Sequence, residues 1–336
     1  MLLITSADHY IGHCVTSHLA RYEHLRPQLR VLCQNKTTCL NFANKGIDVR
    51  EIDYMHPNEV SKAFEGVDHM ILAVGNEADR VAYCEHLCKV ASRSGVQSII
   101  CISHVGAVSS DHEMLAHYSF IEDEVITSTC QWTILRPDWI HQNFHLWSRY
   151  VEKHRHLPLP IPEKAEICPL DITDLCRAVE NLIITSDHKK TIRPNLMDDH
   201  VGQVYTLTGP QAINGKHLVH LLGKTTGYEK FQYRHVRPMD TGYYLDDLPK
   251  DIWFDARVKH EKSQIYSDPL DGYEYRTRLL RAPTPTQIKT YLEYFDWVHN
   301  QAGSLCVPHI STITALPPRS IRKFFQENAN SFKPRV

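Results

Sequence analysis

Residues 2–12 carry the pattern with the most specific chemical implication in the chain. An apolar segment over residues 2–5 leads into a turn that begins at Ser6, and a helical pattern starts near Tyr10. A strand, a tight turn and a helix N-terminus in this order attract phosphate groups, because backbone N–H groups and the helix dipole both favour anions. We therefore predict a dinucleotide site here. Its expected contact residues are Ser6, His9, Tyr10, Ile11 and Gly12.

Three glycines normally shape such a turn, and here their positions hold Ser6, His9 and Gly12. The first position needs a positive φ, which costs a serine roughly 1–2 kcal/mol. The second lets the backbone approach the phosphates, so an imidazole there either blocks them, turns away, or pairs with them when protonated. The third allows close packing of helix on strand, and Gly12 keeps it. This pattern predicts a retained fold with weakened dinucleotide binding.

Composition narrows the function classes. The 336 residues are 42% hydrophobic. Because 37 Lys and Arg balance 39 Asp and Glu, the protein has no net positive electrostatic field that would attract nucleic acid or an anionic membrane. No apolar run is long enough to span a bilayer and no secretory leader is recognisable. We expect a soluble intracellular protein, cytoplasmic or nuclear, that binds neither nucleic acid nor membrane.

The cysteines and histidines show no metal-binding spacing. Ten cysteines are scattered along the chain, and no zinc-ribbon, CxxC or HExxH motif is present. We expect most cysteines to be small buried hydrophobes. A redox role for Cys84 and Cys88 is the weaker alternative. We predict that no metal is bound.

Strand and helix patterns alternate through the first half of the chain. Continuous apolar runs such as residues 70–74 are typical of strands buried on both faces of a parallel sheet. The alternation predicts an α/β fold with a doubly wound parallel sheet, a Rossmann fold. Strands are expected over residues 2–5, 29–33, 48–52, 70–74, 98–103 and 132–135, and helices from near 10, over 59–64 and over 80–94.

The second half is less regular. We expect a Rossmann core over residues 1–150 and a smaller α+β lobe over residues 151–336, interleaved with the core. Asn214 should cap a helix, and residues 238–283 lack periodicity and are interpreted as an insertion. The other elements expected are helices over 173–184, 214–226 and 287–298, strands over 204–207 and 231–236, and a last helix that ends at Phe325.

Several segments, in order across most of the chain, resemble the NmrA-like family of atypical short-chain dehydrogenases/reductases. The segments are Ile4-Thr5 with Tyr10-Ile11-Gly12, residues 64–68 leading into 70–74, Thr133-Ile134-Leu135-Arg136-Pro137 with Asn143-Phe144, residues 171–175, residues 205–210, and Pro318-Arg319-Ser320-Ile321 with Phe325. The resemblance implies a Rossmann fold that binds NADP or NAD, either as a regulatory ligand or as the coenzyme of a reductase.

The resemblance also implies further cofactor contacts. Gln34 stands where relatives that select NADP place an arginine, and no acidic residue there favours NAD. Lys36 is close, although a solvated loop lysine is the simpler interpretation. Asp53 matches the acidic residue that holds the adenine amine, with a loop-capping role equally open. The remaining contacts expected are Val74, Gly75, Ser103 and Pro137.

The Tyr-x-x-x-Lys pair of reductases is missing. Counting back from residues 133–137 places Met114 in the tyrosine position and Tyr118 in the lysine position. Methionine has no proton to donate, and a neutral phenol does not replace an ammonium ion. Ser103, His104 and Tyr118 are weak catalytic candidates. Ser103 and His104 are neighbours, and adjacent residues of a strand face opposite sides.

Two main functions follow from these observations, and a scaffold that binds no nucleotide is a third possibility. The first is an NmrA-like protein with a degenerate glycine motif and a regulatory role, in which NAD(P) acts as a signal, a protein partner is bound and catalysis is weak or absent. The alternative is an NAD(P)H-dependent oxidoreductase that acts on a small carbonyl or quinone. The retained cofactor fold and the second lobe favour the alternative, whereas Met114 and Tyr118 favour the first.

Overall fold

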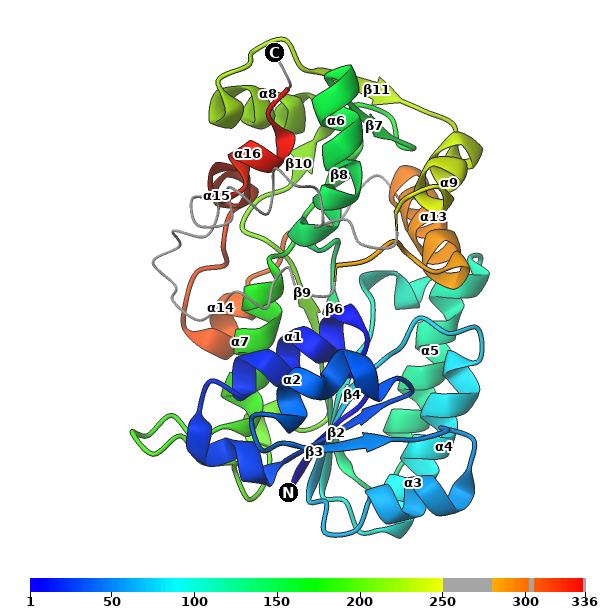
Figure 1. Ribbon diagram of the computed structural model, residues 1–336, viewed down its shortest axis with the longest axis vertical. Helices are drawn as coiled ribbons and strands as arrows, with labels where there is room; N and C mark the ends of the chain where they lie inside the picture. Colours follow the sequence, from blue (N-terminus) through cyan, green and yellow to red (C-terminus); the bar gives the residue numbers. More distant parts are fainter. Residues whose placement is uncertain (250–279, 302–304, 335–336) are drawn as a thin grey trace. The chain divides into compact units, whose positions relative to one another are not determined.

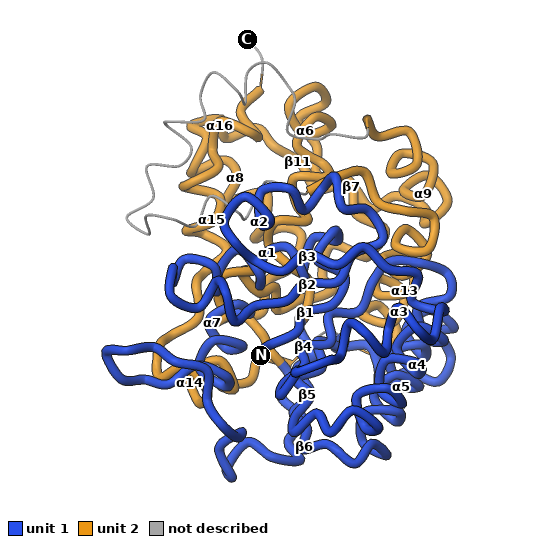
Figure 2. Tube along the Cα trace, turned by 60° about the horizontal axis from the view of Figure 1, so that its bottom comes forward, with its two compact units in different colours: residues 1–137, 175–206 blue, residues 138–174, 207–336 orange. Residues whose placement is uncertain are grey.

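The chain folds into two compact units, each formed by two separate stretches of sequence. Unit 1 consists of Met1–Pro137 and Leu175–Thr206, and unit 2 of Asp138–Asp174 and Leu207–Val336 (Figure 2). The computed structural model describes residues 1–249, 280–301 and 305–334. This division differs from the expected boundary at residue 150, because the chain returns to the sheet of unit 1 after residue 174.

Unit 1 is built on a seven-stranded sheet with the order β3-β2-β1-β4-β5-β6-β9. All neighbouring pairs from β3 to β6 are parallel. The order of these six strands is that of the doubly wound fold, which confirms the predicted fold class. The strands are β1 (Leu2–Ile4), β2 (Leu29–Cys33), β3 (Asp48–Glu51), β4 (His69–Ala73), β5 (Ser98–Ile102), β6 (Gln131–Pro137) and β9 (Gln203–Leu207).

Helices cover both faces of this sheet. In Figure 1, α3, α4 and α5 lie on one side of the strands, and α1 and α2 lie on the other. The α-helices are α1 (Tyr10–Leu19), α2 (Leu40–Ala43), α3 (Pro57–Ala63), α4 (Arg80–Arg93), α5 (Glu113–Ile126) and α7 (Ile172–Ile183), and the 3-10 helices are η1 (Glu23–Gln28), η2 (Lys36–Cys39), η3 (Val105–Val108) and η5 (Asp198–His200). Because the strands are parallel, their carboxyl ends bring the loops after β1, β2, β4 and β5 to one edge.

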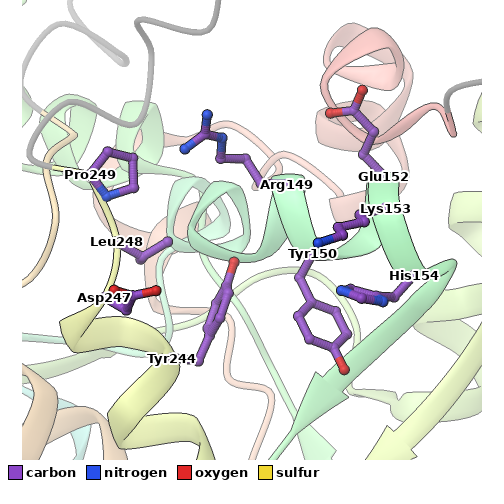
Figure 3. Close-up of a pocket in the computed structure, with 9 residues that line it drawn as sticks. All are labelled: Arg149, Tyr150, Glu152, Lys153, His154, Tyr244, Asp247, Leu248 and Pro249. Atoms are coloured by element: carbon purple, nitrogen blue, oxygen red, sulfur yellow. The ribbon is translucent and has the colours of Figure 1, made fainter.

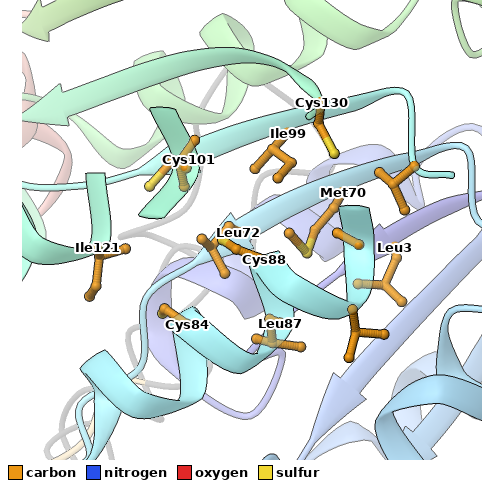
Figure 4. Packing of buried hydrophobic residues seen from close by; sticks show 14 of the residues in the cluster. Leu3, Met70, Leu72, Cys84, Leu87, Cys88, Ile99, Cys101, Ile121 and Cys130 are labelled. Atoms are coloured by element: carbon orange, nitrogen blue, oxygen red, sulfur yellow. The ribbon is translucent and has the colours of Figure 1, made fainter. Parts of the chain in front are cut away.

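The core of unit 1 contains several of the cysteines. Cys84 and Cys88 of α4 pack with apolar strand residues such as Leu72 and Cys101 (Figure 4). Burial raises the pKa of Cys84 far above its ordinary value and that of Cys88 to about 12. Thiols that stay protonated are poor nucleophiles. The expectation of buried hydrophobic cysteines is confirmed for this pair, and the structure gives no support to a redox role.

Unit 2 is mainly helical, with two small two-stranded sheets. In one sheet β7 (His156–Leu159) and β11 (Gln232–His235) are parallel, and in the other β8 (Glu166–Ile167) and β10 (Ile213–Asn214) are antiparallel. As predicted, Asn214 caps a helix, its side chain accepting the His217 N–H at 3.0 Å. The helices are η4 (His141–Trp147), α6 (Ser148–His154), α8 (Gly215–Thr226), α9 (Pro238–Asp246), α13 (Pro285–Asn300), α14 (His309–Thr314), α15 (Ile321–Glu327) and α16 (Ala329–Phe332).

Two features of unit 2 depart from the sequence-based expectations. Segment 238–283 was expected to be irregular, but its first residues form helix α9, which starts at Pro238 and packs on α13. Residues 250–279 of the segment lie outside the described residues. Cys168 and Cys306 form a disulfide across 138 residues of sequence, with Cα atoms 5.8 Å apart. No spacing rule indicates this pair, because the two cysteines are brought together only by the tertiary fold.

Candidate functional site

The turn after β1 keeps the backbone shape of a phosphate-binding loop without its first glycine. Ser6 has a φ of +49°, so the serine carries the predicted left-handed strain. Its N–H donates to the Tyr54 hydroxyl at 2.9 Å, and its carbonyl accepts the His9 N–H at 2.9 Å. Burial raises the pKa of Tyr54 well above its ordinary value, so the hydroxyl remains protonated. These contacts hold the turn in a conformation that serine alone would not favour.

Gly12 has the packing role expected of the third glycine. A Cβ at this position would lie 2.3 Å from the Ser6 carbonyl oxygen and 2.7 Å from that of Thr5. Since both neighbours are backbone atoms, no side-chain movement could relieve the overlap. The close approach of α1 to the turn therefore depends on Gly12, as predicted.

His9 is paired with an acidic residue that the sequence did not indicate. Its Nε2 lies 2.6 Å from Oε1 of Glu77, in the loop after β4. Glu77 also reaches over Gly75, since a Cβ added there would be 2.0 Å from Glu77 Oε2. Burial opposes ionisation of Glu77, but the hydrogen bond and charge of His9 outweigh it and lower the pKa of the carboxyl. A carboxylate thus lies beside two predicted cofactor contacts, His9 and Gly75.

The end of β2 is capped by Asp8, which lies between the first two glycine positions. Asp8 Oδ2 accepts the N–H groups of Gln34 at 2.9 Å and of Asn35 at 3.0 Å. The N–H of Lys36 donates to Glu51 Oε1 at 3.2 Å. The structure therefore places acidic groups at the end of β2, although the residues that directly follow this strand carry none.

Asp53, after β3, caps a loop, which was one of the two roles expected of it. Its Oδ1 accepts the Met55 N–H at 2.8 Å, and its own N–H donates to Glu59. The side chain is exposed. A role in adenine binding stays a prediction, as do the expected contacts of Tyr10, Ile11, Val74 and Pro137. The structure places Tyr10 and Ile11 at the start of α1, Val74 directly after β4 and Pro137 at the end of β6.

Ser103, after β5, is held in an ionic network. Its hydroxyl donates to Glu122 of α5. Arg136 of β6 donates two hydrogen bonds to the same carboxylate, and the bond from Nε is 2.9 Å long. The partner of Arg136 is thus a buried carboxylate. With its proton directed to Glu122, Ser103 has no second proton to donate to a substrate.

Tyr118, in the expected lysine position, is accompanied by a buried arginine. The Arg80 guanidinium carbon lies 4.6 Å from the centre of the Tyr118 ring, and Nη1 lies 3.3 Å from the hydroxyl. Arg80 Nη2 also donates to the Met114 carbonyl at 2.6 Å. The His104 ring stacks on Tyr118 with centroids 5.2 Å apart. Burial and the charge of Arg80 lower the pKa of His104 to about 3.

Ser103 and His104 contact different residues of α5, Glu122 and Tyr118, so the structure does not direct them to one atom. The residues that the sequence missed are Asp8, Glu77, Arg80 and Glu122. Asp8 was detectable in principle, because it lies inside the turn motif. The other three are recognised only through their partners in space.

A cavity of about 740 Å³ lies in unit 2 (Figure 3). It is formed by α6 and by residues at and after the end of α9, and the centroids of the Tyr150 and Tyr244 rings lie 5.5 Å apart, edge to face. Arg149 and Lys153 contribute positive charge, and Glu152 and Asp247 contribute negative charge. This mixed lining shows no preference for one class of ligand.

Two absences apply to the described ranges. Within residues 1–249, 280–301 and 305–334, no three His, Cys, Asp or Glu side chains are grouped so that they could hold a metal ion. In the same ranges no helix has the length and apolarity that a membrane span requires.

The turn fits a dinucleotide through its backbone. The left-handed Ser6 and the close packing at Gly12 reproduce the backbone of the turn that holds a pyrophosphate at a helix N-terminus. The Glu77 side chain opposes phosphate binding, because its carboxylate lies beside His9 and Gly75. The turn therefore has the backbone expected of a dinucleotide site, with one carboxylate beside the position expected for the phosphates.

Comparisons with known proteins agree with this geometry. Residues 7–157 match the family model described as NAD(P)H-binding. The chain is 23% identical to quinone oxidoreductase 2 of Escherichia coli over 302 residues, which cover 88% of this chain and 99% of that protein.

Two solved structures share the fold. Triphenylmethane reductase of Citrobacter sp., complexed with NADP(H), superposes with a TM-score of 0.74 at 15% identity, covering 98% of this chain and 100% of that one. NmrA, a negative transcriptional regulator, in complex with NADP, superposes with a TM-score of 0.64 at 11% identity, covering 97% and 94% of the two chains. At these identities the two structures show that the fold is shared, and the matched model adds an NAD(P)H-binding region over residues 7–157.

Proposed function

We propose that this chain, which has an NAD(P)-binding fold and resembles the NmrA-like family, binds NAD(P)(H) in unit 1 mainly as a regulatory ligand and transfers hydride slowly or not at all. The observation that carries this proposal is the Ser103–Glu122–Arg136 network. In this network the Ser103 hydroxyl, after β5, donates its proton to Glu122. Ser103 lies at the edge of the sheet where the reactive end of a dinucleotide would lie.

The residues that would hold the nucleotide lie at the carboxyl edge of the sheet. The backbone from Ser6 to Gly12 and the start of α1 would receive the pyrophosphate, and the residues after β2 would receive the adenine ribose. When bound in its reduced form, the nicotinamide supplies a hydride. The residues beside the nicotinamide would have to supply a proton, and this chain lacks a suitable proton donor there.

A proton relay is weak in this site for three reasons. Met114 has no proton to donate, the Ser103 proton is committed to Glu122, and the low pKa of His104 keeps its imidazole neutral at working pH. A regulatory ligand needs no such relay. A protein partner would then recognise the nucleotide-bound form of the protein, and this partner is part of the proposal.

A second candidate function, an NAD(P)H-dependent reductase, is favoured by one observation. The Arg80 guanidinium lies 3.3 Å from the Tyr118 hydroxyl, so a cation and a phenol lie together beside the position expected for the catalytic pair. In a reductase, Tyr118 Oη would give its proton to a substrate oxygen and Arg80 would stabilise the phenolate that remains. The similarity to a quinone oxidoreductase over 88% of the chain supports the same candidate.

Binding and turnover measurements separate the two functions. The pure protein is titrated with NADH and NADPH by calorimetry, and reduction of a panel of quinones and small carbonyls is followed with each coenzyme. Micromolar binding with turnover no faster than the uncatalysed rate supports the regulatory proposal. Sustained turnover overturns it in favour of the reductase.

If turnover is found, Tyr118→Phe identifies the proton donor. This variant keeps the ring that stacks on His104 and Arg80 and removes only the hydroxyl. A loss of kcat of about 100-fold with unchanged coenzyme affinity is expected of a proton donor. Tyr83→Phe in α4 is the matched control. Unchanged kcat in Tyr118→Phe would remove Tyr118 from the mechanism.

A further inference from the structure

Asp8 is fixed at the point where the second strand ends. Its Oδ2 accepts two backbone N–H groups, from Gln34 and Asn35, so the carboxylate is held by residues on the other side of the turn. Its Oδ1 is buried and has no hydrogen-bond partner among the described residues. The carboxylate is therefore anchored by one oxygen, and its charge is not balanced by any ion pair that the described structure contains.

This location is the one that distinguishes the two coenzymes. In doubly wound folds an acidic residue at the end of the second strand accepts a hydrogen bond from the 2′-hydroxyl of NAD, whereas an arginine nearby accommodates the 2′-phosphate of NADP. Here Gln34 replaces the arginine, and the acidic group reaches the same place from the turn after β1. We infer that Asp8 makes this site select NAD(H) over NADP(H), an inference that rests on the proposed nucleotide binding.

The surroundings of Asp8 work against a 2′-phosphate in two further ways. The N–H groups of Gln34 and Asn35, which could otherwise bind phosphate oxygens, are already occupied by Asp8. The Glu51 carboxylate is also close to this loop, because it accepts the Lys36 N–H at 3.2 Å. A 2′-phosphate, with about two negative charges, would face these carboxylates, whereas a neutral 2′-hydroxyl would not be repelled.

Lys36 is the cation that could oppose this selection. Its side chain is exposed, and solvent screens an exposed ammonium group more strongly than the half-buried carboxylate of Asp8. Asp8 should therefore dominate. The selection would distinguish this chain from Citrobacter triphenylmethane reductase and NmrA, whose structures contain NADP(H) or NADP.

The test uses ligands that isolate the adenosine half of the coenzyme. The full-length protein is titrated by calorimetry with ADP-ribose and with 2′-phospho-ADP-ribose, and then with NADH and NADPH. We expect the ligands without the 2′-phosphate to bind at least about tenfold more tightly. In Asp8→Asn, whose amide oxygen can still accept the two N–H groups, the 2′-phosphorylated ligands should gain about tenfold while ADP-ribose changes little.

Two control variants keep the inference falsifiable. Asp123→Asn, an exposed charge change on α5, should leave the ratio of the two affinities unchanged, and Lys36→Ala should change it little. Equal or tighter binding of the 2′-phosphorylated ligands by the unmodified protein, or an unchanged ratio in a folded Asp8→Asn variant, would overturn the inference. Failure of all four ligands to bind would instead overturn the proposed function.

Discussion

The imidazole of His9 and the carboxylate of Glu77 form a 2.6 Å contact that joins the start of α1 to the loop after β4. Both groups are partly buried, with about a fifth of each side chain exposed. Since the same carboxylate lies over Gly75, one acidic side chain lies beside two positions that were expected to contact the coenzyme. The second glycine position therefore carries a hydrogen bond to a carboxylate in addition to a bulkier residue.

Removal of this carboxylate should strengthen nucleotide binding. Glu77→Gln keeps the size of the side chain and removes the negative charge beside the phosphate position. We expect NADH to bind about fivefold more tightly, a gain of about 1 kcal/mol. Calorimetric titration measures the change, with Glu85→Gln on α4 as a control that should not alter it. Weaker binding in Glu77→Gln would show that the pair assists the nucleotide.

The strain at Ser6 can be measured by comparing two substitutions. Ser6→Ala and Ser6→Gly both lose the hydroxyl, but only glycine tolerates a φ of +49° without penalty. Ser6→Gly should therefore be more stable than Ser6→Ala by about 1 kcal/mol in urea unfolding. Equal stability of the two variants would mean that the turn relaxes to another conformation when the serine is replaced.

Acidification should destabilise the protein partly through His104. The folded-state pKa of about 3 lies below the ordinary 6.5, because burial and Arg80 oppose the charged imidazole. Between these values the unfolded chain binds a proton that the folded chain does not, so stability is complete above about pH 6.5 and falls as the pH decreases. At about pH 5 the loss should be at most about 2 kcal/mol.

His104→Asn isolates this contribution. The His104 Nδ1 accepts the Gly106 N–H at 2.9 Å, and an asparagine oxygen can accept the same hydrogen without titrating. Urea unfolding at about pH 7.5 and about pH 5 should show a smaller loss of stability in the variant than in the unmodified protein. The same loss in both proteins would assign the pH dependence to other groups.

The Cys168–Cys306 disulfide should contribute to stability under oxidising conditions. It closes a loop of 138 residues, for which chain entropy predicts about 4–5 kcal/mol. Dithiothreitol should lower the unfolding midpoint of the unmodified protein and leave that of Cys306→Ser unchanged. A midpoint insensitive to reductant in the unmodified protein would show that the two thiols are not bonded in solution.

The alternation of strands and helices was predictable because each buried strand is a continuous apolar run, as in residues 70–74. The role of Gly12 and the strain at Ser6 were also predictable, since both follow from local backbone geometry. Contacts between residues far apart in sequence were not. Glu77 meets His9 across 68 residues, and Arg80 meets Tyr118 across 38, through packing that no local pattern records.

Asp8 illustrates a different limit. Gln34 and Asn35, which directly follow the second strand, carry no charge. The acidic group arrives from the turn after β1, because parallel strands bring two loops to one edge. A search for charge near a ligand has to include every loop at that edge, and only the strand order tells which loops those are.

The discontinuous course of unit 1 limits how the protein can be divided. A fragment that stops at residue 150 would lack β9, and the outer side of β6 would then present unpaired N–H and C=O groups to solvent. Open edges of this kind recruit strands from other molecules. Truncation at that point should therefore yield aggregates, whereas a fusion that joins residues 1–137 to 175–207 through a short linker would retain all seven strands.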